Sequence, residues 1–162
     1  RVMIVIAAGL AVGMDPMQSL KNVMVVNNLP SLWGDAIPGL VYASGKIDGV
    51  FEESWDGLSK EGTATESTVA ICRATRKGSS VPTERRYSAA DAKAQKLWGK
   101  GGPWSNSPKR MLQIRARAWL ARDLFPDVLG GLGIVEEESE VRPSGSAVNE
   151  LNGKIAALPQ TE

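Results

Sequence analysis

Hydrophobic residues in the first part of the chain form one long run and several shorter stretches, which predict two helices with a pair of short strands between them. An almost continuous apolar run opens the sequence, and Gly9 and Gly13 end it. Asn27 and Asn28 separate two Val-, Met- and Leu-containing stretches, and asparagine tolerates the positive φ of a tight turn. Asp35 is placed to begin a short helix. The expected elements are helices at 2–10 and 35–44 and strands at 22–27 and 31–34.

Alternating apolar and polar residues predict an antiparallel sheet in the next part of the chain. A polar segment at 57–66 separates two stretches of alternating pattern, as the loop of a long hairpin does. Ser88 and Asp91 have the spacing of a capping box, so a short helix should follow the sheet and run through Lys96. The expected strands lie at 50–55 and 68–75, with a weaker third at 82–87.

A longer helical pattern follows a loop at 97–106. Ser107 and Pro108 suit the N-cap and the first helical position, and the pattern continues to about Phe125, where Pro126 ends or kinks the helix. Strands followed by helices indicate the α+β class. We therefore expect a small antiparallel β-sheet packed with helices, including a long basic helix at about 107–125.

Composition changes after Ile134. An acidic run at 136–138 is followed by a stretch rich in Pro, Gly and Ser, which is typical of a linker or tail. The expected organisation is a folded core at 1–135 and an acidic linker or tail at 136–162. The sequence begins with Arg1 rather than Met, so we expect the natural N-terminus to lie upstream.

Several classes of chemistry are disfavoured by what the 162 residues contain. There is no histidine, so Ser-His-Asp and Cys-His relays and imidazole-held zinc are excluded. Cys72 is the single cysteine, which rules out an intrachain disulfide and fits a reducing compartment. No stretch has the roughly 20 apolar residues that cross a bilayer, so no membrane role is expected. The Gly-x4-Gly-Lys-Ser/Thr spacing of a P-loop is also absent.

Charge is distributed very unevenly. Residues 1–75 hold five basic and eight acidic side chains, and residues 123–162 hold two basic and eight acidic ones. Between them, residues 76–122 hold twelve basic and two acidic side chains, a net charge of +10 in a chain whose net charge is +1. Such a block favours a polyanionic partner, and a cationic surface that is merely solvated is the alternative.

The long helix contains two arginines on the wrong side for a simple amphipathic helix. On a helical wheel, Arg115 and Arg122 fall inside the apolar arc, two turns or about 10 Å apart along the axis. A buried cation needs solvent, a carboxylate or an anionic ligand, so this stripe either follows a nucleic-acid backbone or pairs with Asp123, Asp127 or another acid. The opposite, solvated side should hold Lys109, Arg110, Gln113 and Arg117.

The loop before this helix allows two interpretations. Trp104 lies among lysines that include Lys100, an arrangement that suits base stacking beside phosphate contacts, but a loop tryptophan is more often a packing anchor. The acidic cluster at 136–140 could hold a metal ion, although a solvated linker is the preferred interpretation.

Residues 102–112 and their flanks carry a resemblance to a known family. They read GPWSNSPKRML, and Arg115 and Arg122 follow. This segment closely resembles the G-P-W-x-x-x-P-K-R-M-L motif of the RecT/Redβ family of phage single-strand DNA annealing proteins. Weaker similarities follow in the same order as in that family, so the resemblance covers about residues 2–135. They are IAAGL at 6–10, GMDP at 13–16, KNVMV at 21–25, LWGD at 32–35, ICRATRK at 71–77 and FPDVL at 125–129.

The resemblance implies a protein that binds single-stranded DNA, anneals complementary strands without ATP and assembles into rings or helical filaments. On matching positions, Lys109, Arg115 and Arg122 would contact phosphates, and Lys21 is a weaker candidate. The basic block and the loop add Arg110, Arg117, Lys100 and Trp104 as candidate binding residues. The family's N-terminal oligomerisation segments and its C-terminal partner-recruiting module are not recognisable in this sequence.

The expected role is therefore that of a binding and assembly protein rather than an enzyme, with no cofactor. Its partners would be single-stranded DNA, the annealed duplex, further copies of the chain and, by resemblance, a phage exonuclease and a host single-strand-binding protein, all in the cytoplasm of a bacterial host. The alternative is a metal-dependent nuclease that uses Asp35, Asp48 or the cluster at Glu136.

Overall fold

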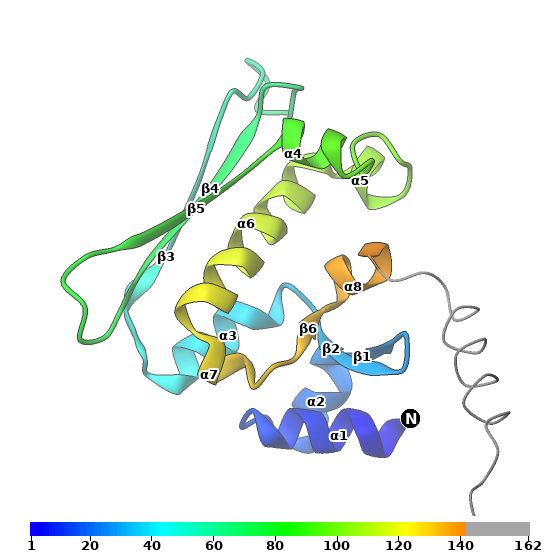
Figure 1. Ribbon diagram of the computed structural model, residues 1–162, viewed down its shortest axis with the longest axis vertical. Coiled ribbons are helices and arrows are strands. Elements are labelled where there is room, and N and C mark those ends of the chain that lie inside the picture. The colour runs from blue at the N-terminus through cyan, green and yellow to red at the C-terminus, as the bar shows by residue number, and fades with distance from the viewer. Residues whose placement is uncertain (142–162) are drawn as a thin grey trace, which may run out of the picture.

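The computed structural model describes residues 1–141, which form two small three-stranded sheets packed with helices (Figure 1). The α+β class is therefore confirmed, with two sheets where the sequence predicted one. The helices are α1 (Val2–Ala11), α2 (Pro16–Asn22), α3 (Ala36–Ser44), α4 (Ala89–Ala94), α5 (Pro103–Asn106), α6 (Pro108–Leu124), α7 (Pro126–Leu129) and α8 (Val135–Val141).

The first sheet joins the two ends of the described chain. Strands β1 (Val23–Val26) and β2 (Leu29–Leu32) form an antiparallel hairpin, and β6 (Gly133–Ile134) pairs with β2 in parallel. Asn27 and Asn28 have φ values of 49° and 66°, so the predicted tight turn with positive φ is confirmed.

The second sheet is antiparallel, in the order β3 (Ile47–Asp56), β4 (Val69–Arg76) and β5 (Thr83–Ser88). The three strands predicted at 50–55, 68–75 and 82–87 are confirmed, with β3 beginning three residues earlier than expected. The capping box at the end of β5 is also present: Ser88 and Asp91 cap each other's backbone N–H groups at the start of α4.

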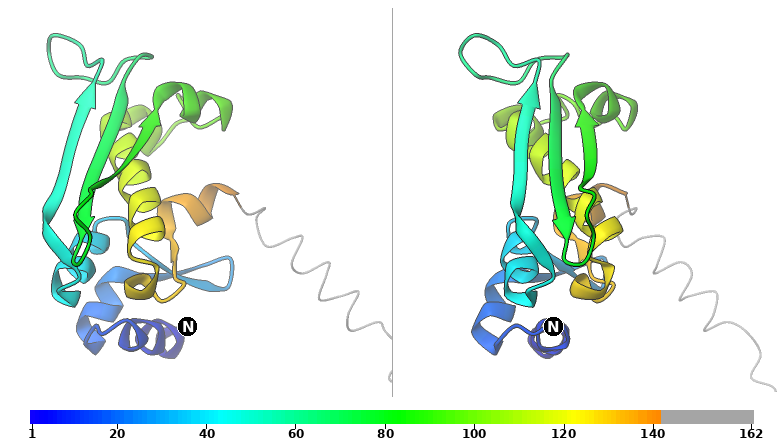
Figure 2. Two further views of the ribbon diagram at one scale, coloured as in Figure 1. Left: turned by 60° about the vertical axis from the view of Figure 1, so that its left-hand side comes forward. Right: turned by 90° about the vertical axis from the view of Figure 1, so that its left-hand side faces the viewer.

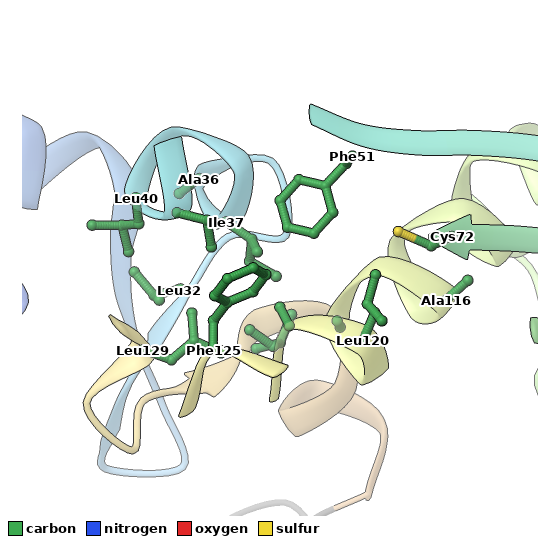
Figure 3. Close-up of a cluster of buried hydrophobic side chains, with 14 of the residues drawn as sticks. Leu32, Ala36, Ile37, Leu40, Phe51, Cys72, Ala116, Leu120, Phe125 and Leu129 are labelled. Atoms are coloured by element: carbon green, nitrogen blue, oxygen red, sulfur yellow. The ribbon is translucent and has the colours of Figure 1, made fainter. Parts of the chain in front are cut away.

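Helix α6 lies along one face of the second sheet (Figure 2). The inward-facing residues of β4 are small, namely Ala70, Cys72 and Ala74, so the helix can approach the sheet closely. Ala116 and Leu120 are also fully buried on α6, near Cys72 (Figure 3). The prediction of a helix with one broad solvated side is therefore wrong, because the sheet covers a side that the wheel assigned to solvent.

The main core lies where the C-terminal end of α6 meets α3 and β2. Phe125 is fully buried among Leu32, Ile37 and Leu129 (Figure 3), and its ring meets the edge of Phe51 at a centroid distance of 6.0 Å. Helix α6 ends at Leu124, and the short α7 starts at Pro126, so the predicted break at this proline is confirmed. This packing fixes the direction of α6 relative to both sheets.

The acidic segment after Ile134 begins as a helix, so residues 136–141 of the expected linker or tail lie in α8. Helix α8 is held by specific contacts: Glu136 accepts the Gly34 backbone N–H at 3.0 Å, and Glu137 is buried among arginines of α6. An acidic run looks like a solvated linker when its cationic partners are distant in sequence. The rest of the predicted tail, residues 142–162, lies outside the described residues.

Within residues 1–141, no single helix is long and apolar enough to cross a membrane. Helices α1 and α2 reach the required length and composition only together, and they bend by 109° at the break between them.

Candidate nucleic-acid interface

A cleft of about 310 Å³ runs beside α6 and brings together side chains from four elements. Helix α6 contributes Arg115, Trp119 and Arg122, which follow one another at spacings of four and three residues and therefore share one face. Strand β5 contributes Tyr87, helix α4 contributes Asp91, and helix α8 contributes Glu137; Gln95, just after α4, completes the lining. The predicted stripe of Arg115 and Arg122 thus lines one cavity.

Both arginines of the cleft are paired with the same carboxylate. Arg122 donates through Nη2 to Glu137 Oε1 at 3.0 Å and through Nη1 to Oε2, and Arg115 Nη1 lies 3.7 Å from Oε1. The sequence left phosphate and a structural acid as alternatives for this stripe, and the structure supplies an acid. It is Glu137 rather than Asp123 or Asp127, which pair with other cations.

The lining holds two arginines and two carboxylates, Glu137 and Asp91, so its formal charges balance. The two arginines also differ in access: the Arg115 side chain is 7% exposed, whereas the Arg122 side chain is 45% exposed. Arg122 can therefore reach a ligand directly. Arg115 is held deeper, with its guanidinium carbon 5.9 Å from the centroid of the Tyr87 ring, while the Tyr87 hydroxyl donates to Gln95 Oε1 at 2.8 Å.

Trp119 lines this cleft and was not among the candidate residues of the sequence analysis. Its side chain is exposed in the structure. The guanidinium of Arg85 lies over the indole at 5.8 Å from the ring centroid, and Arg85 Nε donates to Asp123 at 2.7 Å. Its spacing from Arg115 and Arg122 places it on the same face of the helix, and this spacing was the feature of the sequence from which its place in the cleft could have been predicted.

Arg117, a candidate on the supposedly solvated side, is buried instead. Its Nε and Nη2 donate to the two carboxylate oxygens of Glu53 at 2.7 Å and 2.9 Å, so it ties α6 to the edge of β3. Arg117 is therefore engaged by Glu53 in this structure, and a contact with nucleic acid stays a prediction. Close by, burial and then the Glu53 charge raise the pKa of the Cys72 thiol to about 12, which keeps this cysteine neutral.

Lys109 and Arg110 face a different cleft, of about 610 Å³, at the N-terminal end of α6. The Lys109 ammonium lies 4.7 Å from the centroid of the Trp55 ring and donates to the Gly62 carbonyl at 3.2 Å. Arg110 pairs with Asp35 and donates to Gln113 Oε1 at 2.7 Å. The structure therefore separates these two cations from the Arg115 and Arg122 stripe.

The other candidates have different surroundings. Trp104 is 3% exposed and packs in the core, as expected of a packing anchor, and its stacking role stays a prediction. Lys100 is exposed in the loop before α5, and Lys21 is exposed in the last turn of α2. Neither lines the cleft beside α6.

The acids of the alternative nuclease interpretation are spread over the fold. Asp35 pairs with Arg110 and Arg117, Glu136 binds the Gly34 N–H, and Asp48 lies on β3. Burial raises the pKa of Glu136. In the part of the chain that the structure describes, no group of three or more His, Cys, Asp or Glu side chains could hold a metal ion.

Comparison with known proteins finds no matching family model, no matching curated protein and no matching solved structure. The site is therefore interpreted from its own geometry. That geometry is a cleft with two arginines and an exposed indole, an arrangement suited to an anionic ligand that also has flat apolar surfaces.

Proposed function

We propose that this protein binds single-stranded DNA in the cleft beside α6 and promotes ATP-independent annealing of complementary strands. The observation that carries the proposal is that Arg115, Trp119 and Arg122 line one cleft on one face of α6. Guanidinium groups bind phosphates, and stacking on an aromatic ring tolerates any base. The cleft thus suits a strand bound with little sequence preference.

The charge of the surrounding chain supports the same proposal. Residues 76–122, with their net charge of +10, include β5, α4 and α6, the three elements that form most of the cleft wall. Salt bridges to acids outside the block neutralise part of this charge; these acids include Glu53, Glu66, Asp123, Asp127 and Glu137. What remains would attract a polyanion at long range.

Assembly into rings or filaments remains part of the proposal, and the surface of α1 and α2 supports it. Helix α1 contains only apolar residues and glycine, and its outer face, with that of α2, leaves large apolar side chains exposed. A second copy of the chain is the occupant we propose for this surface, since apolar faces of this kind are typical of interfaces between identical subunits. The exposed apolar side chains of α1 and α2 are Val2, Met3, Ile4, Leu10, Met17 and Leu20.

The annealed duplex is the proposed product. A phage exonuclease that makes single strands and a host single-strand-binding protein are proposed partners, in the cytoplasm of a bacterial host.

The test is a pair of solution measurements on the same protein. Binding of a fluorescent oligo(dT) is followed by anisotropy at increasing salt, and annealing of two complementary oligonucleotides is followed without nucleotide. If a protomer neutralises about four phosphates, log K should fall with log salt at a slope of about −3. Affinity that is indifferent to salt, or an absolute requirement for ATP, would contradict the proposal. Shortened products in magnesium would favour the nuclease alternative.

A further inference from the structure

Trp119 is a large aromatic side chain that the fold leaves on the surface beside two cations. Its side chain is 44% exposed, although most of α6 is buried against the sheet or the core. Trp33 is comparably exposed, at 41%, but it lies against a different cavity whose lining includes Met24 and Glu136. Trp119 is therefore the exposed tryptophan that shares a cavity with the arginine stripe in the described chain.

We infer that Trp119 is a stacking platform for one nucleobase of the strand whose phosphates Arg115 and Arg122 hold. This inference rests on the proposed function and adds a contact that the charge pattern does not predict. The indole lies between the two arginines in helical order, one turn from each. A strand that follows this stripe with its phosphates passes the indole with its bases.

The surroundings of the indole fix the side from which a base approaches. Arg85 covers one face of the ring, and its pairing with Asp123 holds the guanidinium there. A base would then stack on the other face, and the cleft that Trp119 lines has a volume of about 310 Å³, which is sufficient for a single base. The Arg85 cation and the base would enclose the indole from both sides.

Stacking of this kind is compatible with annealing. It uses the flat face of a base and leaves its Watson–Crick edge free, so a base on Trp119 can still be tested for pairing by an incoming strand. The contact would order one base for each protomer without reading its identity.

The experiment compares Trp119→Ala, Trp119→Phe and the matched control Trp33→Ala on two probes, oligo(dT) and an abasic oligodeoxyribose phosphate of equal length. We expect Trp119→Ala to weaken oligo(dT) binding about 5- to 150-fold, the range for losing one stacked base. Its salt slope should stay at the wild-type value because no charge is removed. Trp119→Phe should retain most of the affinity, and Trp33→Ala should bind as wild type does.

The abasic probe and tryptophan fluorescence separate stacking from a structural effect. The wild type and Trp119→Ala should bind the abasic probe equally, whereas a misfolded variant would lose both probes. Oligo(dT) should quench the wild-type fluorescence, and Trp119→Phe should lose that quenching.

Two failures can be told apart. If Trp119→Ala binds oligo(dT) as the wild type does while Arg122→Ala binds weakly, the stacking inference is overturned and the proposed function stands. If the wild type binds neither probe at low salt, the proposed function fails and the inference fails with it.

Discussion

Glu137 of α8 and Arg122 of α6 form a two-point ion pair, in which the guanidinium donates to both carboxylate oxygens and the Nη2–Oε1 distance is 3.0 Å. Phosphate oxygens bind a guanidinium in the same two-point manner. Glu137 therefore occupies the position in which we propose that a DNA phosphate binds. The carboxylate has two opposite consequences, since it neutralises the buried Arg115 and competes with an anionic ligand.

The first prediction is that Glu137→Gln binds oligo(dT) more tightly and folds less stably than the wild type. The substitution removes the negative charge that competes with phosphate, so affinity should rise on the order of tenfold. It also leaves Arg115 without a full counter-charge, so the melting temperature should fall. Glu52→Gln makes the same change of charge at an exposed residue of β3. It is the control and should alter neither the DNA affinity nor the melting temperature. Unchanged affinity in Glu137→Gln would mean that Glu137 does not overlap the ligand.

Arg122 and Arg115 should separate binding from stability. Arg122 is half-exposed, so Arg122→Ala should lower DNA affinity by about 1–3 kcal/mol with little change in melting temperature. Arg122→Lys should recover only part of the loss, because lysine cannot make the two-point contact. Arg115→Ala should destabilise the fold as well, since Arg115 is buried against Glu137. Anisotropy and thermal melting on the same samples measure both effects. A stable Arg122→Ala variant that binds DNA as the wild type does would contradict the proposal that DNA binds in the cleft beside α6.

Arg117 is expected to act on stability alone. Arg117→Ala leaves the largely buried Glu53 carboxylate without its partner, which should cost about 3–5 kcal/mol of unfolding free energy. The double variant Arg117→Met with Glu53→Leu removes both charges and should recover much of that loss. Urea denaturation measures the difference. Recovery of stability without recovery of DNA binding would instead give Arg117 a direct role in the site.

Local signals predicted most elements of this fold, and long-range pairing decided the rest. The Asn27–Asn28 turn and the Ser88 capping box are determined by neighbouring residues, so the sequence identifies them. The helical character of α8 depends on Gly34 and on arginines of α6, which no local pattern reveals.

The wheel for α6 failed for a related reason. A wheel assumes one buried side. Helix α6 is packed against the sheet on one side, where Arg117 forms an internal ion pair with Glu53, and pairs with the buried Glu137 of α8 on another. The same limit applies to the tryptophans. Trp104 and Trp119 both lie near basic residues in sequence, and packing alone decided that the first is buried and the second is exposed.

The last prediction concerns Asp127, which links α7 to cations from two other elements. Hydrogen bonds from Arg76 and then from Lys46 hold the pKa of Asp127 well below its usual range. A carboxyl whose pKa is lower in the folded state contributes stability above its unfolded pKa of about 3.9, and that contribution disappears as the pH falls toward the folded pKa. The wild type should therefore lose stability below about pH 4 more steeply than Asp127→Asn does. At pH 7 the variant should be the less stable of the two, and the difference should hold down to about pH 5 and then shrink with further acidification. Urea midpoints at pH values from 7 down to 3 test this, with Asp48→Asn, an exposed acid of β3, as the control. A difference between the wild type and Asp127→Asn that stays constant over this range would show that the Arg76–Asp127–Lys46 cluster does not stabilise the fold through its charge.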